Sequence, residues 1–235
     1  MEMIKKIQSS QIGRSHHGWL NSVFHFSFSE YYNPQNMNFG VLRVLNDDLV
    51  QPNTGFDPHP HRDMEIISYV VNGQLTHGDN LGNQRSVKRG DIQYMSAGTG
   101  VIHSEHNLGK DTLRFLQLWI IPNLKNHQPS YGDYHFEEEL RQNQWLEVVS
   151  SKTGNAPIKI NQDVHIYVTE LSDQQELTLQ VNQDRQAYLV LIEGEALIND
   201  ISLSMRDALE IKEEAIHIKS IGKSHYLVVE MAYKK

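Results

Sequence analysis

The sequence predicts an all-β protein that contains two stacked copies of one β barrel, and two features of the chain indicate this class. Across the 235 residues, apolar positions fall in short alternating segments bounded by turn residues, without long helical runs. Residues 188–199 also repeat the pattern of residues 67–77, an aliphatic strand that meets a glycine turn, and a turn with an aspartate follows each copy. A weak internal repeat of this kind indicates two related barrels in one chain.

The first half of the chain divides into a series of short strands. Alternation over residues 23–28 predicts a half-buried strand, and residues 39–45 predict a second strand that ends at a turn over residues 46–48. A hairpin is expected at Asn72-Gly73, because this dipeptide favours a tight turn. Short strands at even spacing are typical of a barrel or sandwich. The further strands are expected at residues 64–71, 74–77, 86–88, 92–95 and 113–121.

Two pairs of potential metal ligands lie in this first half. His59 and His61 stand two residues apart, and so do His103 and Glu105, which follow a bend expected at Gly98. Because alternate side chains of a strand point to the same face, each pair presents two donor groups side by side. If the two strands meet in one barrel, three imidazoles and one carboxylate converge on one point. Such a set suits one divalent transition metal, and iron, manganese, cobalt, nickel, copper and zinc all remain open.

The other histidines carry a weaker signal. The chain has 13 histidines, and a single histidine is more often a structural residue than a metal ligand. His16, His17 and His25 have no partner donors at a fixed spacing. We therefore assign them structural roles or contacts to ligand residues.

A change of composition separates the two halves. Residues 122–144 are rich in Asn, His, Pro, Tyr and charged residues, which is typical of a linker, and residues 136–142 could form a short helix. We therefore expect a metal-binding domain over residues 1–132 and a second domain over residues 133–235.

The second domain lacks the ligand pairs of the first. Gln180 and Asn182 stand at the same distance before Gly194 as His59 and His61 stand before Gly73. A further histidine, at position 217, has no glutamate two residues later. We expect this domain to hold no metal.

Composition excludes several functional classes. The formal net charge is −8 and the basic residues are scattered, so no direct contact with nucleic acid is expected. The chain has no cysteine, which excludes disulfides and thiol chemistry. No segment approaches the roughly 18 apolar residues of a membrane span, and the first residues lack the apolar run of a signal peptide. We expect a cytoplasmic protein that does not enter a membrane.

The two ligand segments resemble the two sequence motifs of the cupin superfamily, G-x5-H-x-H-x3/4-E-x6-G and G-x5-P-x-G-x2-H-x3-N. Three rather than five residues separate Gly55 from His59, Ser96 replaces the proline, and four rather than two residues follow Gly98, while Asn107 keeps its place. These departures resemble the pirin family of two-barrel cupins, and especially the bacterial pirin-like quercetin 2,3-dioxygenases. Three N-terminal segments, over residues 17–20, 26–28 and 42–48, are also similar to that family.

The resemblance implies a bicupin fold with two double-stranded β-helix barrels and one metal ion, Fe(II), held by His59, His61, His103 and Glu105. In many cupins the glutamate of the first motif, here Glu65, is the fourth ligand instead. Where Glu65 is not a ligand, we expect it to hydrogen-bond a ligand imidazole.

The resemblance also implies an activity, the cleavage of a flavonol such as quercetin with O2 and release of carbon monoxide. The flavonol hydroxyl would lose its proton at the metal, and Glu105 would accept it as general base. Two alternatives stay open. Pirin itself is regarded as an iron-dependent transcriptional co-regulator, so the chain could be a redox sensor with a protein partner. It could equally be a cupin enzyme for another small molecule. With both barrels on one chain, we expect a monomer.

Overall fold

The protein is described from a computed structural model, which covers residues 3–233. Within these residues nearly all regular structure is β, and the helical part is one 3-10 turn, η1 (Glu138–Arg141). The predicted all-β class is therefore confirmed. No helix in the described part of the chain has the length and apolar character needed to cross a membrane.

The chain folds into two compact units that do not follow a single cut through the sequence. The N-terminal unit contains Gly13–Phe136 together with Ile160–Gln162. The C-terminal unit contains the residues up to Ile12, Glu137–Lys159 and the residues from Asp163 onward. The division into a first domain over residues 1–132 and a second over residues 133–235 stays a prediction from the sequence.

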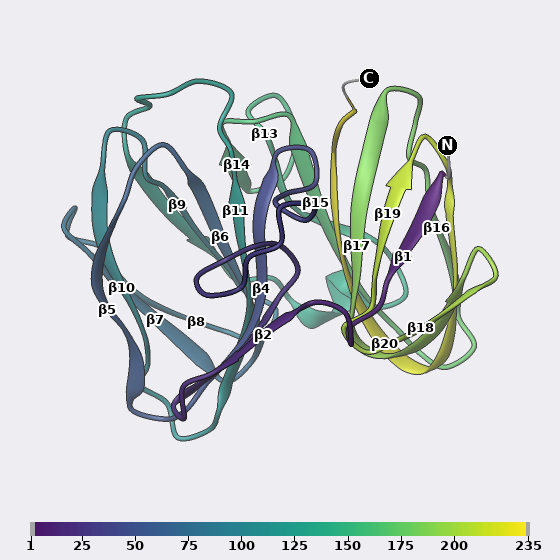
Figure 1. Ribbon diagram of the computed structural model, residues 1–235, viewed down its shortest axis with the longest axis horizontal. Helices are drawn as coiled ribbons and strands as arrows, with labels where there is room; N and C mark the ends of the chain where they lie inside the picture. Colours follow the sequence, from purple (N-terminus) through teal and green to yellow (C-terminus); the bar gives the residue numbers. More distant parts are fainter. Residues whose placement is uncertain (1–2, 234–235) are drawn as a thin grey trace. The chain divides into compact units, whose positions relative to one another are not determined.

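The N-terminal unit is built from two antiparallel sheets that face each other (Figure 1). The larger sheet has the strand order β12 (Ser130–Tyr134), β9 (Ile92–Ser96), β6 (Glu65–Asn72), β11 (Leu113–Ile120), β4 (Leu42–Val50), β3 (Leu20–Phe24) and β2 (Gly13–His16). The smaller sheet has the order β5 (Thr54–His61), β10 (Val101–Asn107), β7 (Gln74–Asp79) and β8 (Gln84–Lys88).

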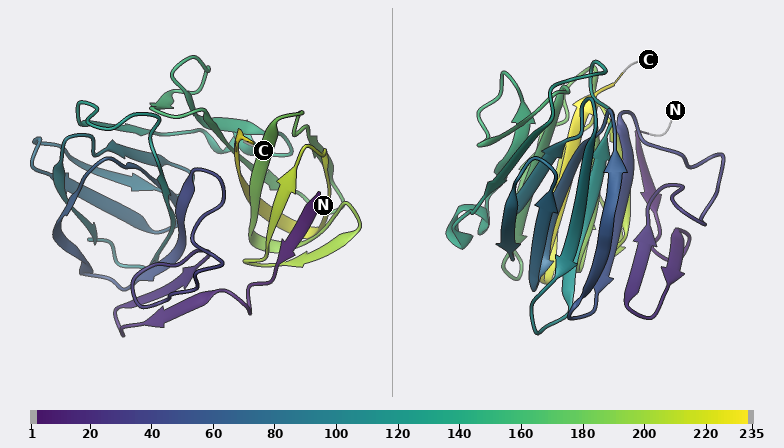
Figure 2. Two further views of the ribbon diagram at one scale, coloured as in Figure 1. Left: turned by 45° about the horizontal axis from the view of Figure 1, so that its top comes forward. Right: turned by 90° about the vertical axis from the view of Figure 1, so that its left-hand side faces the viewer.

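A hydrophobic core joins these two sheets. Val70 and Phe115 from the larger sheet pack in one buried cluster with Leu75 and Val87 from the smaller sheet. Figure 2 (left) shows the strands of this unit arranged in a ring. The continuous apolar run of β6 fits this position, because the residues Glu65–Val71 are all buried between neighbouring strands.

Three local predictions need correction. The strand expected at residues 23–28 lies earlier in the chain, as β3 (Leu20–Phe24), and includes only the first two of those residues. The turn expected at residues 46–48 does not form, because β4 continues through them to Val50. Asp47 accepts two hydrogen bonds from the guanidinium group of Arg114, at 2.9 and 2.7 Å, and this ion pair holds the polar stretch inside the sheet. The stretch 122–144 is also not purely a linker, because β12 pairs with β9. The short helix expected at residues 136–142 is present as η1.

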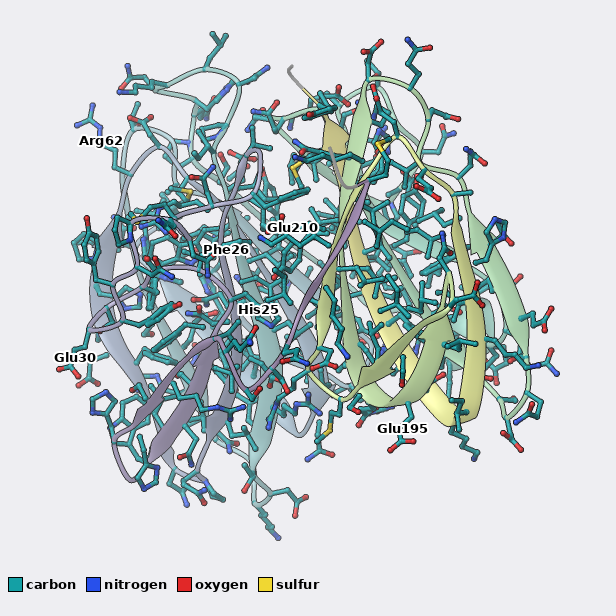
Figure 3. The ribbon with its side chains drawn as sticks, turned by 45° about the vertical axis from the view of Figure 1, so that its right-hand side comes forward. His25, Phe26, Glu30, Arg62, Glu195 and Glu210 are labelled. Atoms are coloured by element: carbon teal, nitrogen blue, oxygen red, sulfur yellow. The ribbon has the colours of Figure 1, made fainter. Side chains whose placement is uncertain are left out.

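The C-terminal unit is one nine-stranded antiparallel sheet. Its path runs β1 (Ile4–Ile7), β19 (Ala208–Lys212), β17 (Arg185–Ile198), β20 (Ile216–Ala232), β15 (Val164–Leu171), β13 (Leu146–Ser151) and β14 (Ile158–Ile160). In addition, β16 (Glu176–Leu179) pairs with β20, and β18 (Ile201–Ser204) pairs with β17. β1 thus forms an outer strand of this unit (Figure 1), and Glu210 lies on the neighbouring strand β19 (Figure 3). The Lys5 ammonium group lies 3.5 Å from the Glu210 carboxylate.

Candidate metal centre

The pairing of β5 with β10 brings the two predicted ligand pairs together. His59 lies opposite His103 in the antiparallel register, and His61 lies opposite Val101. Along β10 buried and more exposed residues alternate, so His103 and Glu105 share the inward face. Local strand periodicity therefore places each pair, and sheet pairing places the pairs beside each other.

The edge position of β5 explains two of its residues. Pro58 and Pro60 alternate with the two histidines and have no N–H group for a sheet ladder. Because β5 is the outermost strand of its sheet, it tolerates both prolines. On the same strand, a Cβ atom at Gly55 would lie only 2.3 Å from the Glu105 carbonyl oxygen, so the close approach of β5 to β10 requires glycine there.

Three imidazoles form a cluster that could hold one metal ion. One ligand nitrogen each from His59, His61 and His103 lies within 4.8 Å of the other two. The Nδ1 atom of His59 donates to the Asp57 carbonyl oxygen at 2.8 Å, which leaves Nε2 with a free lone pair. The Nε2 atom of His103 is buried and has no hydrogen-bond partner among the described residues. A buried nitrogen acceptor beside two further imidazoles fits a transition metal.

Burial and repulsion between the rings keep two of the imidazoles neutral. Burial, followed by repulsion from His103 and His59, lowers the pKa of His61 to about 4. Burial, followed by repulsion from His59 and His77, lowers the pKa of His103 to about 3. Because a metal binds the neutral imidazole, both side chains are in the form needed for coordination at pH 7.

Glu105 lies beside this cluster and lines the same cavity as His59 and His61. Its Oε1 accepts a hydrogen bond from the Ser68 hydroxyl at 3.0 Å, and its Oε2 accepts one from the Gln117 amide at 2.5 Å. Gln117 in turn accepts a bond from the Trp119 indole N–H at 3.3 Å. The carboxylate is therefore held in place by the larger sheet, and its role as a fourth ligand stays a prediction.

Glu65 has different surroundings. Its carboxylate accepts hydrogen bonds from the Tyr94 hydroxyl at 2.6 Å, the Ser96 hydroxyl at 2.7 Å and the Asn161 backbone N–H at 2.9 Å. These partners are not the ligand imidazoles to which the sequence pointed. Glu65 instead ties β6 and β9 to the segment Ile160–Gln162 within the N-terminal unit.

The cavity at the cluster has a volume of about 240 Å³ and is lined by both apolar and polar side chains. The apolar lining includes Phe24, Phe28, Phe56 and Trp119. Six polar side chains that the sequence motifs do not include also line it, namely Ser15, Ser22, Ser29, Asn46, Asp48 and Gln117. The sequence carries a signal for two of these, since Asn46 and Asp48 are two residues apart in a strand, but a run of three polar residues also predicts a turn.

Of the remaining histidines, His17 lines the cavity, whereas His25 is buried elsewhere in the N-terminal unit and its backbone N–H donates to the Leu45 carbonyl oxygen at 3.0 Å (Figure 3). His16 lies exposed beside Asn21. In the C-terminal unit, His217 is exposed on β20, 3.2 Å from the Thr178 hydroxyl.

Comparison with known proteins gives the family of the chain. Residues 6–120 match the family model described as Pirin, and residues 147–231 match the one described as Quercetinase C-terminal cupin domain. The two predicted cupin domains are therefore confirmed.

Relatives match along the whole chain. The chain is 41% identical over 232 residues to a pirin-like protein of Caulobacter vibrioides, with 98% of this chain and 100% of that protein covered. It is 36% identical over 231 residues to quercetin 2,3-dioxygenase of Escherichia coli K12, with coverage of 97% and 99%. The crystal structure of the bacterial pirin YhhW from E. coli in complex with nickel(II) superposes with a TM-score of 0.92 at 35% identity, covering 99% of this chain and 100% of that one. The chain is a member of the pirin family of two-domain cupins.

Proposed function

We propose that the protein is a metal-dependent dioxygenase that cleaves a flavonol with O2 and releases carbon monoxide. The observation that carries this proposal is the cluster of three imidazoles beside a cavity that the Glu105 carboxylate and four aromatic side chains also line. The relatives named quercetin 2,3-dioxygenase support the choice of a flavonol as the substrate class.

We assign one metal ion, Fe(II), to His59, His61 and His103, with Glu105 as the fourth ligand. A bound metal supplies Lewis acidity, which lowers the pKa of a hydroxyl group that coordinates it. The set accepts several first-row metals, and the nickel(II) in the YhhW structure agrees with that breadth. Metal availability in the cell then decides which ion is used.

In this proposal Glu105 accepts the proton of the flavonol hydroxyl. Its two oxygen atoms already accept hydrogen bonds from Ser68 and Gln117, so the carboxylate is oriented before the substrate arrives. The proton transfers to a carboxylate oxygen that faces the cavity, and the substrate is left as an electron-rich anion.

The aromatic walls would bind the flat rings of the substrate and exclude water. Trp119 is central to this wall, because its ring packs edge-on against two others. The ring centroids are 4.7 Å apart for Trp119 and His61, and 5.3 Å apart for Trp119 and Phe28. The indole thereby connects the ligand cluster to the apolar part of the cavity. Trp119 and Phe28 would orient the substrate relative to the metal.

The test is quercetin turnover by the iron-loaded protein, followed as oxygen uptake, loss of flavonol absorbance and carbon monoxide release. His59→Ala is expected to lose bound iron and to turn over at least about 100-fold more slowly. His135→Ala is the matched control, because His135 pairs with Asp91 at 2.6 Å outside the cavity. Full activity in His59→Ala, or no turnover in wild-type protein that holds iron, would reject the proposal.

A second pair of variants separates the two candidate carboxylates. Glu105→Gln is expected to lower turnover at least about 100-fold and to weaken metal binding. Glu65→Gln is expected to lower stability, since four donor groups surround that carboxylate, but to keep metal affinity within about twofold. The reverse pattern, measured by metal titration, would make Glu65 the fourth ligand.

A further inference from the structure

A buried histidine lies directly behind the cluster. His77 is on β7, which pairs with β10, and its side chain is 1% exposed. Its Nδ1 atom lies 3.4 Å from the Nδ1 atom of His103, and the two ring centroids are 5.3 Å apart. Since His103 presents Nε2 to the cluster, His77 contacts the opposite side of the same ring.

A carboxylate lies on the far side of His77. The Nε2 atom of His77 is 3.0 Å from Oδ2 of Asp79, whose side chain is fully buried. The Asp79 carboxylate also accepts bonds from the Leu81 N–H at 2.9 Å, the Asn83 N–H at 3.0 Å and the Asn83 amide at 2.8 Å. Burial alone would raise the pKa of Asp79, but the hydrogen bonds from His77, Asn83 and Leu81 outweigh it and lower the pKa. Asp79 is therefore ionised and can only accept.

The hydrogen positions follow in sequence from this carboxylate. Because Asp79 only accepts, the proton of a neutral His77 is on Nε2, and its Nδ1 atom carries a lone pair. The Gln93 side-chain amide nitrogen, 3.4 Å from the same Nδ1 atom, is a second donor to it. His103 must then donate from Nδ1, which leaves the lone pair on its Nε2 atom, the atom in the cluster.

The contact at His59 provides a comparison. There the partner of Nδ1 is the Asp57 carbonyl oxygen, which can only accept, so one contact is enough to set the tautomer. At His103 the partner is another imidazole, which can donate or accept. A further group therefore has to set the tautomer of His77, and its ring has to be held in one orientation. Asp79 sets the tautomer, because it accepts a hydrogen bond from His77 Nε2. Tyr131 helps to hold the ring, because it stacks on His77 with the ring centroids 4.6 Å apart.

We propose that Asp79 and His77 are positioning residues that hold His103 in the tautomer with a proton on Nδ1 and a free lone pair on Nε2. This inference rests on the proposed function only in taking that lone pair as a metal ligand. Neither residue touches substrate or metal; both act through the ring of His103. The segment Gln74–Asp79 thereby has a role in the site although it contains no ligand.

The first measurement is the tautomer of His103 in metal-free protein with 15N-labelled histidine, read from long-range 1H–15N correlations of the ring nitrogens. Wild-type protein is expected to show a protonated Nδ1 and an unprotonated Nε2 on His103. His77→Phe removes the acceptor and is expected to give a mixture of tautomers. His77→Gln, which has both an acceptor and a donor, is expected to restore the wild-type pattern in part.

The second measurement is the affinity for Ni²⁺ alone, by competition with a chelator. We expect His77→Phe to bind about 10- to 100-fold more weakly, with a smaller loss in Asp79→Asn and in His77→Gln. His135→Phe is the matched control, a change at another His–Asp pair of the same unit, and should bind as wild type does.

The outcomes separate this inference from the metal assignment. A proton on Nε2 of His103 in the wild-type protein would overturn the inference, and so would unchanged tautomer and affinity in folded His77→Phe or, if that variant does not fold, in Asp79→Asn. A wild-type protein that binds no Ni²⁺ but shows the expected tautomer would reject the metal site and leave the positioning role of His77 intact.

Discussion

Asp48 carries a carboxyl group that is buried in the protein, and this burial makes stability depend on pH. The side chain is buried on the cavity wall, and its Oδ1 atom has no hydrogen-bond partner among the described residues. Burial raises its pKa to about 7; a hydrogen bond from Ser22 opposes this shift, and the nearby charges of Asp47 and Glu105 add to it. Near neutral pH the folded protein therefore holds a carboxyl group that the unfolded chain would ionise fully.

This carboxyl group makes the metal-free protein less stable as the pH rises. Because the folded pKa lies above the usual value of 3.8, the stabilisation is complete below about pH 4 and is lost as the pH rises through about 7. Asp48→Asn should therefore increase the free energy of unfolding relative to wild type more at pH 8 than at pH 5, by about 1–3 kcal/mol. Urea unfolding of both proteins at the two pH values measures this difference.

Asp111→Asn is the control, because Asp111 is exposed and its substitution should change stability equally at both pH values. A gain in Asp48→Asn that is the same at pH 5 and pH 8 would contradict the raised pKa.

At the scale of secondary-structure elements, the loop between β9 and β10 positions the start of β10, the strand that carries His103 and Glu105. Gly98, in this loop, has a φ of +43°, and a Cβ atom there would lie 2.0 Å from the His127 carbonyl oxygen. The Gly98 carbonyl oxygen also accepts a hydrogen bond from the Asp63 N–H at 2.9 Å, just after β5. The loop thus connects the ends of the two strands that carry the proposed ligands.

Gly98→Ala should destabilise the protein by about 2–4 kcal/mol, because the substitution adds a steric clash with backbone to the cost of a positive φ. Gly82→Ala is the matched control, since Gly82 has a φ of +92° but open space around its Cα, and about 1–2 kcal/mol is expected. Denaturant unfolding midpoints compare the two. Equal losses would show that the close contact at Gly98 relaxes at no cost.

At the scale of the whole molecule, the chain begins in one unit, enters the other and returns. β1 pairs with β19, and Ile4 packs on the core cluster of the C-terminal unit. After this strand, the Ser9 N–H donates to Asp207 at 2.8 Å, and Lys6 pairs with the same carboxylate at 2.9 Å. The N-terminal segment is therefore structural for a unit that lies more than a hundred residues away in sequence.

Deletion of the residues before Ser9 should lower the stability of the C-terminal unit and leave the metal centre unchanged. Hydrogen exchange is expected to become faster along β19, because its outer ladder and its apolar contact to Ile4 are lost. Ni²⁺ affinity should stay within about twofold of wild type, because the proposed ligands belong to the N-terminal unit. Loss of metal binding without faster exchange in β19 would contradict this division.

The expected oligomeric state also belongs to the whole molecule. Both cupin domains are present in one chain, so the two-domain arrangement needs no second copy. We expect a monomer, and light scattering during size-exclusion chromatography should give the mass of one chain at all concentrations tested. The mass of two chains would reject this prediction.

Much of the candidate site could be predicted because its proposed ligands follow local rules. The spacing of His59 and His61, and of His103 and Glu105, determines which side chains share a strand face. The surroundings of these ligands could not be predicted in the same way. Asp48 was hidden in a polar run that resembled a turn, and nothing local distinguishes it from Asp47, which faces Arg114.

The sequence by itself determined the all-β class, the two related domains and the three clustered imidazoles. Strand periodicity, glycine turns and the internal repeat are properties of short segments, and short segments carry them before any tertiary contact forms. Only the tertiary structure decided that His77 stands behind His103, and that Asn161, 96 residues away in the chain, donates a hydrogen bond to Glu65. Such neighbours depend on which distant strands pair and in which register, and the energy of those pairings comes from burial across the whole unit.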